Sequence, residues 1–372
     1  MTKRNNNKKR MFWTVVQFTV SIAAMIVVVW FGIIDNKEEI NADSIKDDWP
    51  TLQERIDTET IKYEVITRNT DAGDPETVYR IRGIDLIALR LERFDFGLFF
   101  IGVFVYFISM LIASVQWFLL LRFSKIKVTL WDGIRYYFIG LFFNNVLPGS
   151  IGGDLVKGVM LGRKKHHGET IAAGIIVDRV FHFCSLGLIL IVVSCLLYWD
   201  TPVVEKWSVL IFGIAAMTCI GGIVYLIGPS KKWFMALAGL LKKGKLKSVV
   251  IKFIQSMYLF RKKRFLAQIG LMSLASQGVR ILMNYLVARA LFIQSIELRS
   301  FFFVIPIVGF TSAPPISVNG IGVREFIGKS VLTHFGISEV NGILIMFISH
   351  VALVFVSLLG GLLLLYKEKN AR

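Results

Sequence analysis

Long apolar runs separated by short polar segments dominate this chain. A helix needs about 20 mostly apolar residues to cross a hydrocarbon core of about 30 Å. Runs of that length predict six full transmembrane helices, near residues 12–34, 96–121, 171–199, 207–228, 265–292 and 340–366. The first run follows basic residues, as a signal peptide does. Its apolar core exceeds the roughly 7–15 residues of a signal and no small-residue cleavage site follows, so we expect a retained anchor.

Two further segments are apolar but broken by proline and glycine. Residues 144–157 read NNVLPGSIGGDLVK, and residues 301–326 read FFFVIPIVGFTSAPPISVNGIGVREF. Broken backbone at membrane depth is tolerated only where protein or a water-filled cavity surrounds it. The predicted transmembrane helices before and after each segment end and begin on the same face of the membrane, and the segment is too apolar to stay in water. We therefore expect re-entrant helical hairpins at about 131–168 and 301–335.

One soluble piece interrupts the pattern, at residues 35–95. KYEVITRN and TVYRIRGI alternate in the manner of strands on either side of a DAGDP turn, which predicts a β-hairpin. So short a segment buries little apolar area, and we expect contacts with the membrane domain or the lipid surface to stabilise it. An external cap or spacer is the simplest role for it.

The expected fold is therefore an all-α polytopic membrane protein with about six full transmembrane helices, two oppositely oriented re-entrant hairpins and a small extracytoplasmic α+β or β-hairpin insert. Its parts are a basic N-terminus with the first anchor (1–34), the acidic insert (35–95) and the transmembrane domain (96–372).

Charge orients these parts. The insert carries 16 acidic and 9 basic residues, a net charge of −7, which leaves +24 on the rest of a chain whose total is +17. The basic residues cluster at 3–10, 122–127, 163–165, 231–264 and 367–372. Cytoplasmic loops are rich in Lys and Arg. We therefore expect a multi-pass protein of the cytoplasmic (inner) membrane with both termini inside and the insert outside, and with the two hairpins entering from opposite faces.

Composition excludes several function classes. With 55% hydrophobic residues and a mean hydropathy of +0.62, the chain has too little polar surface for a soluble globule. Basic residues that flank membrane helices are routine, and no nucleic-acid-binding motif accompanies them, so we expect no nucleic-acid partner. The 3 cysteines fall in apolar runs, and His166 and His167 lack a ligand spacing, so we expect no metal and no cofactor.

The basic stretch 230–264 interleaves Lys and Arg with aromatic and aliphatic residues. This pattern suits amphipathic helices in the headgroup layer. An ordinary cytoplasmic connecting helix would have the same pattern, and both interpretations stay open.

Charged residues inside the apolar segments are the candidate functional residues. A charge at membrane depth is energetically costly, and such residues usually have a function. Lys157, Arg179 and Arg324 could match a lipid phosphate, and helices that begin after Gly153 and Gly322 would direct their positive ends toward an anion. The carboxylates of Asp154, Asp178 and Glu325 could hold those cations or carry a proton. Structural ion pairs within each motif are the alternative. His182 could be a proton relay or a hydrogen-bonded core residue.

Three motifs carry a resemblance to a known family. NNVLPGSIGGDLVKG, then DRVFHF at 178–183, then PPISVNGIGVREF at 314–326 are similar to the lysylphosphatidylglycerol synthase transmembrane family, also described as the UPF0104 family of membrane proteins. The resemblance extends from about 96 to 366. Many relatives carry Arg where this chain has Lys157, and the insert is an addition to the common pattern.

The resemblance implies a flippase-like domain. In the family's best-understood branch this domain resembles a lipid flippase that moves an aminoacylated phospholipid made by an attached soluble transferase domain. We find no such transferase in this chain, so we expect a non-enzymatic protein that binds or moves an anionic phospholipid or a polyprenyl-phosphate-type lipid. The alternative is an accessory protein or an enzyme of lipid-linked glycan or aminoacyl-lipid metabolism, and a separate lipid-modifying enzyme is a conceivable partner. No catalytic residues are expected. The candidate lipid-binding residues are Asn144, Asn145, Pro148, Gly149, Gly152, Gly153, Asp154, Lys157, Asp178, Arg179, Pro315, Asn319, Gly320, Gly322, Arg324 and Glu325.

Overall fold

The structure is a computed structural model, and it describes residues 37–41, 63–69, 75–147, 152–198, 201–226, 251, 263–314 and 319–365. Within those residues, four helices are long and apolar enough to cross a membrane. They are α5 (Phe96–Phe123), α8 (Gly168–Leu197), α12 (Lys263–Ala290) and α15 (Glu339–Leu365). The prediction of a multi-pass helical membrane protein is therefore confirmed.

The other two predicted spans have different outcomes. The span near 207–228 corresponds to α9 (Pro202–Leu226), a helix of 25 residues that is not among those four. The first span, near 12–34, lies outside the described residues, as does most of the basic stretch 230–264.

Outward-facing apolar stripes explain why these helices suit lipid. On α5, the side chains of Phe96, Phe100 and Phe104 are 63%, 52% and 60% exposed. Their spacing of four residues puts them on one face of the helix. On α8, Leu188, Val192 and Leu196 repeat the pattern. Contiguous exposed apolar surface of this kind marks a face that contacts lipid or protein rather than water.

The acidic insert contains a three-stranded antiparallel sheet in the order β1-β3-β2. Strands β2 (Tyr63–Asn69) and β3 (Pro75–Arg82) pair from Tyr63 opposite Ile81 to Asn69 opposite Pro75, which confirms the predicted hairpin. Strand β1 (Lys37–Asn41) adds to the other edge of β3 and was not predicted.

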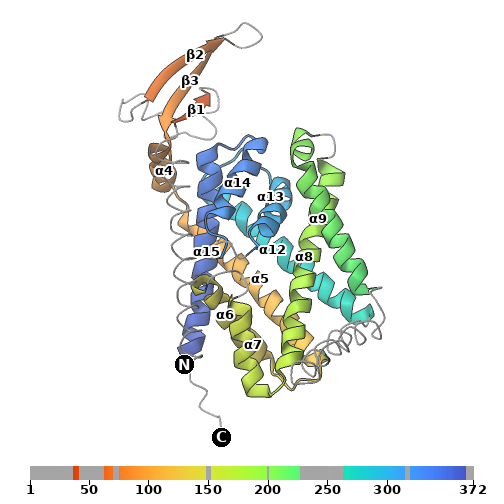
Figure 1. Ribbon diagram of the computed structural model, residues 1–372. Helices are drawn as coiled ribbons and strands as arrows, with labels where there is room; N and C mark the ends of the chain where they lie inside the picture. Colours follow the sequence, from red (N-terminus) through yellow and green to blue (C-terminus); the bar gives the residue numbers. More distant parts are fainter. Residues whose placement is uncertain are drawn as a thin grey trace, which may run out of the picture.

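Helix α4 (Gly83–Glu92) connects this sheet to the helical domain and packs against it. Ile81, Leu86 and Leu89 form a small apolar cluster with Val340 at the start of α15. The buried Arg90 donates to the backbone oxygens of Leu291 and Phe292, just after α12, and to Oδ1 of Asn341. The end of α12 and the start of α15 therefore lie at the sheet end of the molecule (Figure 1).

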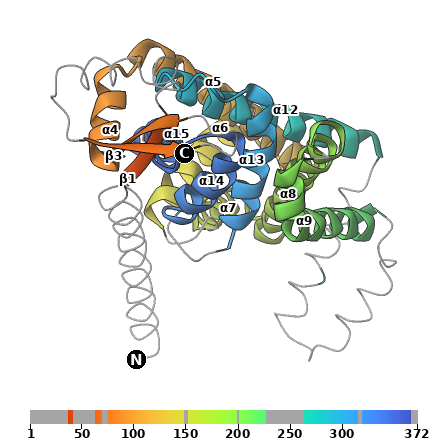
Figure 2. The same cartoon turned by 90° about the horizontal axis from the view of Figure 1, so that it is seen from above.

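Two pairs of short helices lie between the long ones. The first pair is α6 (Leu130–Val146) and α7 (Gly152–Lys165), and the second is α13 (Leu298–Thr311) and α14 (Val323–Leu332). A short 3-10 helix, η2 (Thr333–Phe335), follows α14. Seen from above, α13, α14, α6 and α7 occupy the middle, with α5 and α12 along one side and α8 and α9 at another (Figure 2).

The two pairs open toward opposite ends of the molecule. Lys164 and Lys165, at the end of α7, contact the Asp132 carboxylate at the start of α6, so the first pair has both outer ends together. Lys329 of α14 contacts Glu339 of α15, which places the outer end of the second pair toward the sheet. Figure 1 shows α6 and α7 in the half away from the sheet and α13 and α14 in the half near it.

Candidate functional site

The inner ends of the two helix pairs meet. Asn319, just before α14, donates through Nδ2 to Oδ1 of Asn145 near the end of α6. Asn145 in turn donates to the hydroxyl of Ser357 on α15, at 2.6 Å. One hydrogen bond, between side chains 174 positions apart in sequence, thus joins the two broken segments in the interior.

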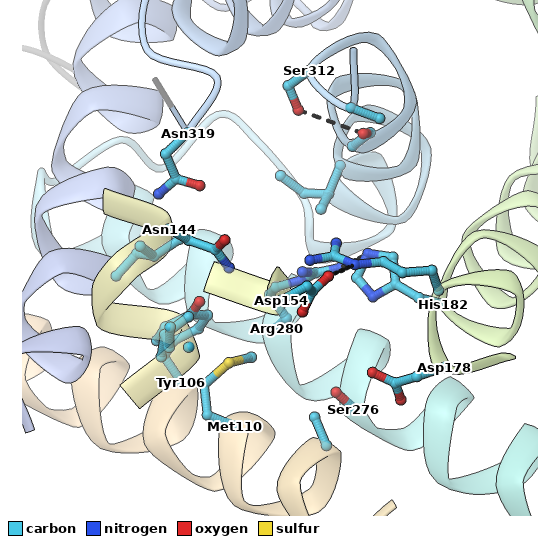
Figure 3. A pocket seen from close by; sticks show the side chains of 18 of the residues that line it. Tyr106, Met110, Asn144, Asp154, Asp178, His182, Ser276, Arg280, Ser312 and Asn319 are labelled. Atoms are coloured by element: carbon cyan, nitrogen blue, oxygen red, sulfur yellow. Dashed lines mark hydrogen bonds and ion pairs between the residues drawn. The ribbon is translucent and has the colours of Figure 1, made fainter. Parts of the chain in front are cut away.

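A cavity of about 180 Å³ lies at this meeting point. Its walls come from α5, α6, α7, α8, α12, α13, α14 and α15, and many of its polar side chains are drawn in Figure 3. The charged side chains that line it are Asp154, Lys157, Asp178, Arg179, Arg280 and Arg324, and the uncharged polar ones include Tyr106, Tyr137, Asn144, His182, Ser276, Asn284, Ser312 and Asn319.

The carboxylate of Asp154 is already shared by two cations. Lys157 Nζ lies 2.8 Å from Oδ1, and Arg179 Nε donates to Oδ2 at 2.5 Å. The Lys157 side chain is only 4% exposed, and its ammonium group also lies over the rings of Trp117 and Tyr137, at 5.0 and 4.8 Å from their centroids. Aromatic faces attract cations, so the charge of Lys157 is well compensated within the protein.

Asp178 occupies the other side of the same cluster. Its Oδ1 accepts from Nε2 of Gln116 on α5 at 2.9 Å, and its Oδ2 lies 3.9 Å from Lys157 Nζ. The charged residues of α7 and α8 thus form one interlocked group rather than separate pairs of sequence neighbours.

Two further guanidinium groups enter the cavity from other helices. Arg280 comes from α12 and Arg324 from α14. Within the part of the chain that the structure describes, neither has a carboxylate partner among the ion pairs; Arg324 Nη1 lies 3.5 Å from His350 Nδ1 instead. Four cations and two carboxylates line the cavity, so its formal charge is +2.

Glu325 does not offset that excess within the cavity. It is buried and absent from the cavity wall, and its Oε2 accepts from the backbone N–H of Gly322 at 2.6 Å. This bond caps the first turn of α14. Similarly, Asn144 Oδ1 accepts from the N–H of Gly153 at the start of α7, at 2.8 Å. Each of the two helix starts predicted to face an anion therefore has a backbone donor already engaged by a side chain.

The structure brings many of the predicted site residues to the cavity wall: Asn144, Asp154, Lys157, Asp178, Arg179, Asn319 and Arg324. It places Asn145, Gly152, Gly153, Gly320, Gly322 and Glu325 behind that wall, in the packing and capping of the helix ends. Pro148, Gly149 and Pro315 lie outside the described residues.

Arg280 is the main residue that the sequence analysis missed. It lies in the apolar run 265–292, which the pattern predicts as a continuous transmembrane helix, away from the two broken segments. The cost of an intramembrane cation, which drew attention to Asp154, applies equally to Arg280 and could have found it.

The comparisons with known proteins agree with this architecture. The profile of the family described as "Lysylphosphatidylglycerol synthase TM region" matches residues 77–361, well over half of the chain. The chain belongs to this family. A UPF0104 membrane protein of Pyrococcus horikoshii is 24% identical over 319 residues, which cover 77% of this chain and 92% of the relative. No solved structure matches.

Proposed function

We propose that the protein binds the phosphate-bearing headgroup of an anionic lipid in the central cavity and moves that lipid across the cytoplasmic membrane. The observation that carries this proposal is the excess of two positive charges on the cavity wall, contributed by Arg280 and Arg324. Buried charge without a counter-charge is costly, so an anionic ligand would relieve that cost. Guanidinium groups suit phosphate because their donors match its oxygens in pairs.

The size of the cavity supports a headgroup rather than a whole lipid as the buried part. A cavity of about 180 Å³ holds several water molecules but not two acyl chains. Such a space admits a phosphate and a small substituent. The acyl chains would remain in the bilayer beside apolar stripes such as that of α5.

The orientation of the helices supports transport. The end opposite the sheet carries Arg122 at the end of α5, the basic end of α7 and the start of α12, and Phe123 of α5 stacks on Phe265 of α12 there. By the preference of Lys and Arg for the cytoplasmic side, this end is inside and the acidic insert is outside. The pair α6–α7 then dips from the inside and the pair α13–α14 from the outside, as re-entrant hairpins.

Opposed broken segments that meet at a charged site are typical of transporters, in which each segment gates access from one side. The hydrogen bond between Asn145 and Asn319 lies at this junction. We propose transport rather than catalysis as the activity. If a soluble enzyme co-purifies and no lipid moves, an accessory role in lipid metabolism would be favoured instead.

The test compares charge removal at the cavity with charge removal elsewhere. Arg280→Gln and Arg324→Gln should each lower the retention of anionic lipid by the purified full-length protein, measured by native mass spectrometry, and slow lipid movement in reconstituted vesicles. One charge-assisted contact typically corresponds to about tenfold in affinity. The control is Arg299→Gln, because Arg299 lies on α13, is exposed and pairs with Glu297 away from the cavity. Retention that is equal in all three variants would contradict the proposal.

A further inference from the structure

Behind the cavity wall, a buried glutamine joins Arg280 to His182. Gln277 is only 2% exposed and lies one turn before Arg280 on α12. Arg280 Nη2 donates to Gln277 Oε1, and Gln277 Nε2 lies 2.9 Å from His182 Nδ1. Arg280 and His182 both line the cavity, whereas Gln277 does not, and Figure 3 shows the two side chains next to each other.

These contacts determine which atoms donate. A guanidinium has only donors, so the amide oxygen of Gln277 must face Arg280 and the amide nitrogen must face His182. The same nitrogen lies 3.5 Å from the backbone oxygen of His182, which fits this orientation of the amide. The nitrogen is a donor, and therefore His182 Nδ1 must accept.

The histidine tautomer follows. A neutral imidazole has one accepting and one protonated nitrogen. With Nδ1 accepting, the proton is on Nε2, which makes Nε2 a donor. It lies 3.4 Å from Arg280 Nη2, which is also a donor. Two donors this close cannot satisfy each other, and one acceptor within hydrogen-bond distance of both nitrogens would serve both.

We infer that Arg280 and His182 form a two-donor subsite for one anionic oxygen of a phosphate group, with Gln277 as the positioning residue that orients both donors. This inference rests on the proposed function and deepens it. The accepting side chain is a neutral amide, so Gln277 orients Arg280 without neutralising its positive charge. Ser276, on the adjacent turn of α12, and Asn284, whose Oδ1 has no hydrogen-bond partner among the described residues, also line the cavity.

The decisive substitution is Gln277→Glu. A glutamate has the shape of glutamine and still accepts from Arg280, but it accepts from His182 as well. The proton of the imidazole then moves to Nδ1, and Nε2 becomes an acceptor that faces Arg280. Arg280 would then donate to Nε2 of His182, so neither group would need an external acceptor. The arginine would also gain a counter-charge from the carboxylate that Gln277→Glu introduces.

Two measurements on the purified full-length protein test this inference. In 15N spectra of histidine-labelled protein, His182, identified by its loss in His182→Asn, should be protonated on Nε2 in the wild type and on Nδ1 in Gln277→Glu. The affinities for inorganic phosphate and for dihexanoyl phosphatidylglycerol should both fall about tenfold, a change of about 1.4 kcal/mol. The tautomer reports the contact between residue 277 and His182, and the two affinities report what that contact does to the ligand.

The control is Gln294→Glu, the same chemical change at an exposed position after α12. It should leave the tautomer and both affinities as in the wild type. An unchanged His182 tautomer, or unchanged binding of both probes, in a Gln277→Glu protein that still folds would overturn the subsite.

The two probes also separate this inference from the proposed function. Tighter binding of the short-chain lipid than of phosphate, with both weakened by Gln277→Glu, supports both. Equal affinities that are both weakened support the subsite and contradict a lipid ligand. Tight lipid binding that Gln277→Glu leaves unchanged supports the lipid function and overturns the subsite.

Discussion

At the residue scale, Asp154 is the centre of the charged cluster. Its two oxygens serve two different cations, Lys157 from its own helix and Arg179 from α8. Both cations would lose their closest carboxylate if that charge were removed. A buried ion pair adds little net stability compared with apolar packing, but breaking one is strongly destabilising because a charge stays behind without compensation.

Asp154→Asn should therefore destabilise the fold by about 3–5 kcal/mol, the range typical of a broken buried ion pair. The measurement is thermal unfolding of the purified protein in detergent. Asp85→Asn is the matched control, because Asp85 pairs with Arg82 at the surface of α4 and such pairs contribute about 1 kcal/mol or less. A loss of stability no larger than that of the control would show that the cluster can reorganise around the missing charge.

The sequence identifies these residues better than it identifies their partners. A charged residue in an apolar segment is easily recognised in the sequence. This applies to Asp154, Lys157, Asp178, Arg179 and Arg324. Their pairing depends on how α7, α8 and α5 are rotated against one another, which local patterns do not encode. Arg179 therefore binds Asp154, 25 positions away, and Glu325 caps a helix rather than forming an ion pair with its neighbour Arg324 in the described structure.

At the element scale, the close contact of α6 and α7 depends on glycine. A Cβ atom on Gly153 would lie 1.8 Å from the carbonyl oxygen of Gly140 and 2.7 Å from Oδ1 of Asn144. The obstacle at Gly140 is backbone, which cannot rotate away as a side chain can. Gly153 was predicted as a lipid-binding residue, whereas in the structure its missing side chain allows the close contact between the two helices.

Gly153→Ala should force α6 and α7 apart and cost about 1–3 kcal/mol, the usual range for overpacking a tight contact. It should also move Asn144 and Lys157 in the cavity wall and reduce lipid retention. Thermal unfolding and native mass spectrometry would measure the two effects.

Gly278→Ala on α12 is the control, since its added Cβ would meet no heavy atom within 4 Å. Alanine there should be neutral or stabilise the helix by up to about 1 kcal/mol. If Gly153→Ala behaved like this control, the tight contact would not be required.

Elements whose apolar and polar residues alternate regularly, or that consist of a long apolar run, could be predicted. The β2–β3 hairpin and the four long helices α5, α8, α12 and α15 follow directly from such patterns. Strand β1 was missed because KEEIN is short and mostly charged. Its place in the sheet comes from pairing with β3, for example Lys37 opposite Arg82, and a pairing so distant in sequence leaves no local signal.

At the scale of the whole molecule, the two helix pairs reach the cavity from opposite ends. The α6–α7 pair opens away from the sheet and the α13–α14 pair opens toward it, and their inner ends meet at Asn145 and Asn319. In the proposed transport mechanism, the sheet end faces outward and each helix pair would act as the gate on one side of the membrane. The orientation of the molecule is therefore central to the transport proposal.

Site-directed labelling tests that orientation. The background is a protein whose Cys184, Cys195 and Cys219 have been replaced by alanine. In it, the cysteine introduced by Thr67→Cys should react with an impermeant thiol reagent applied to intact cells. A cysteine at His166→Cys should react only after the cells are permeabilised. Both positions are exposed, Thr67 on β2 and His166 after α7, so solvent access is not what distinguishes them. The physical reason for the difference is the net charge of −7 on the insert against the basic end of α7. Reaction of His166→Cys alone in intact cells would reverse the assigned faces, and reaction of both would mean that the two ends are not separated by a membrane, which would remove the basis for opposed gates.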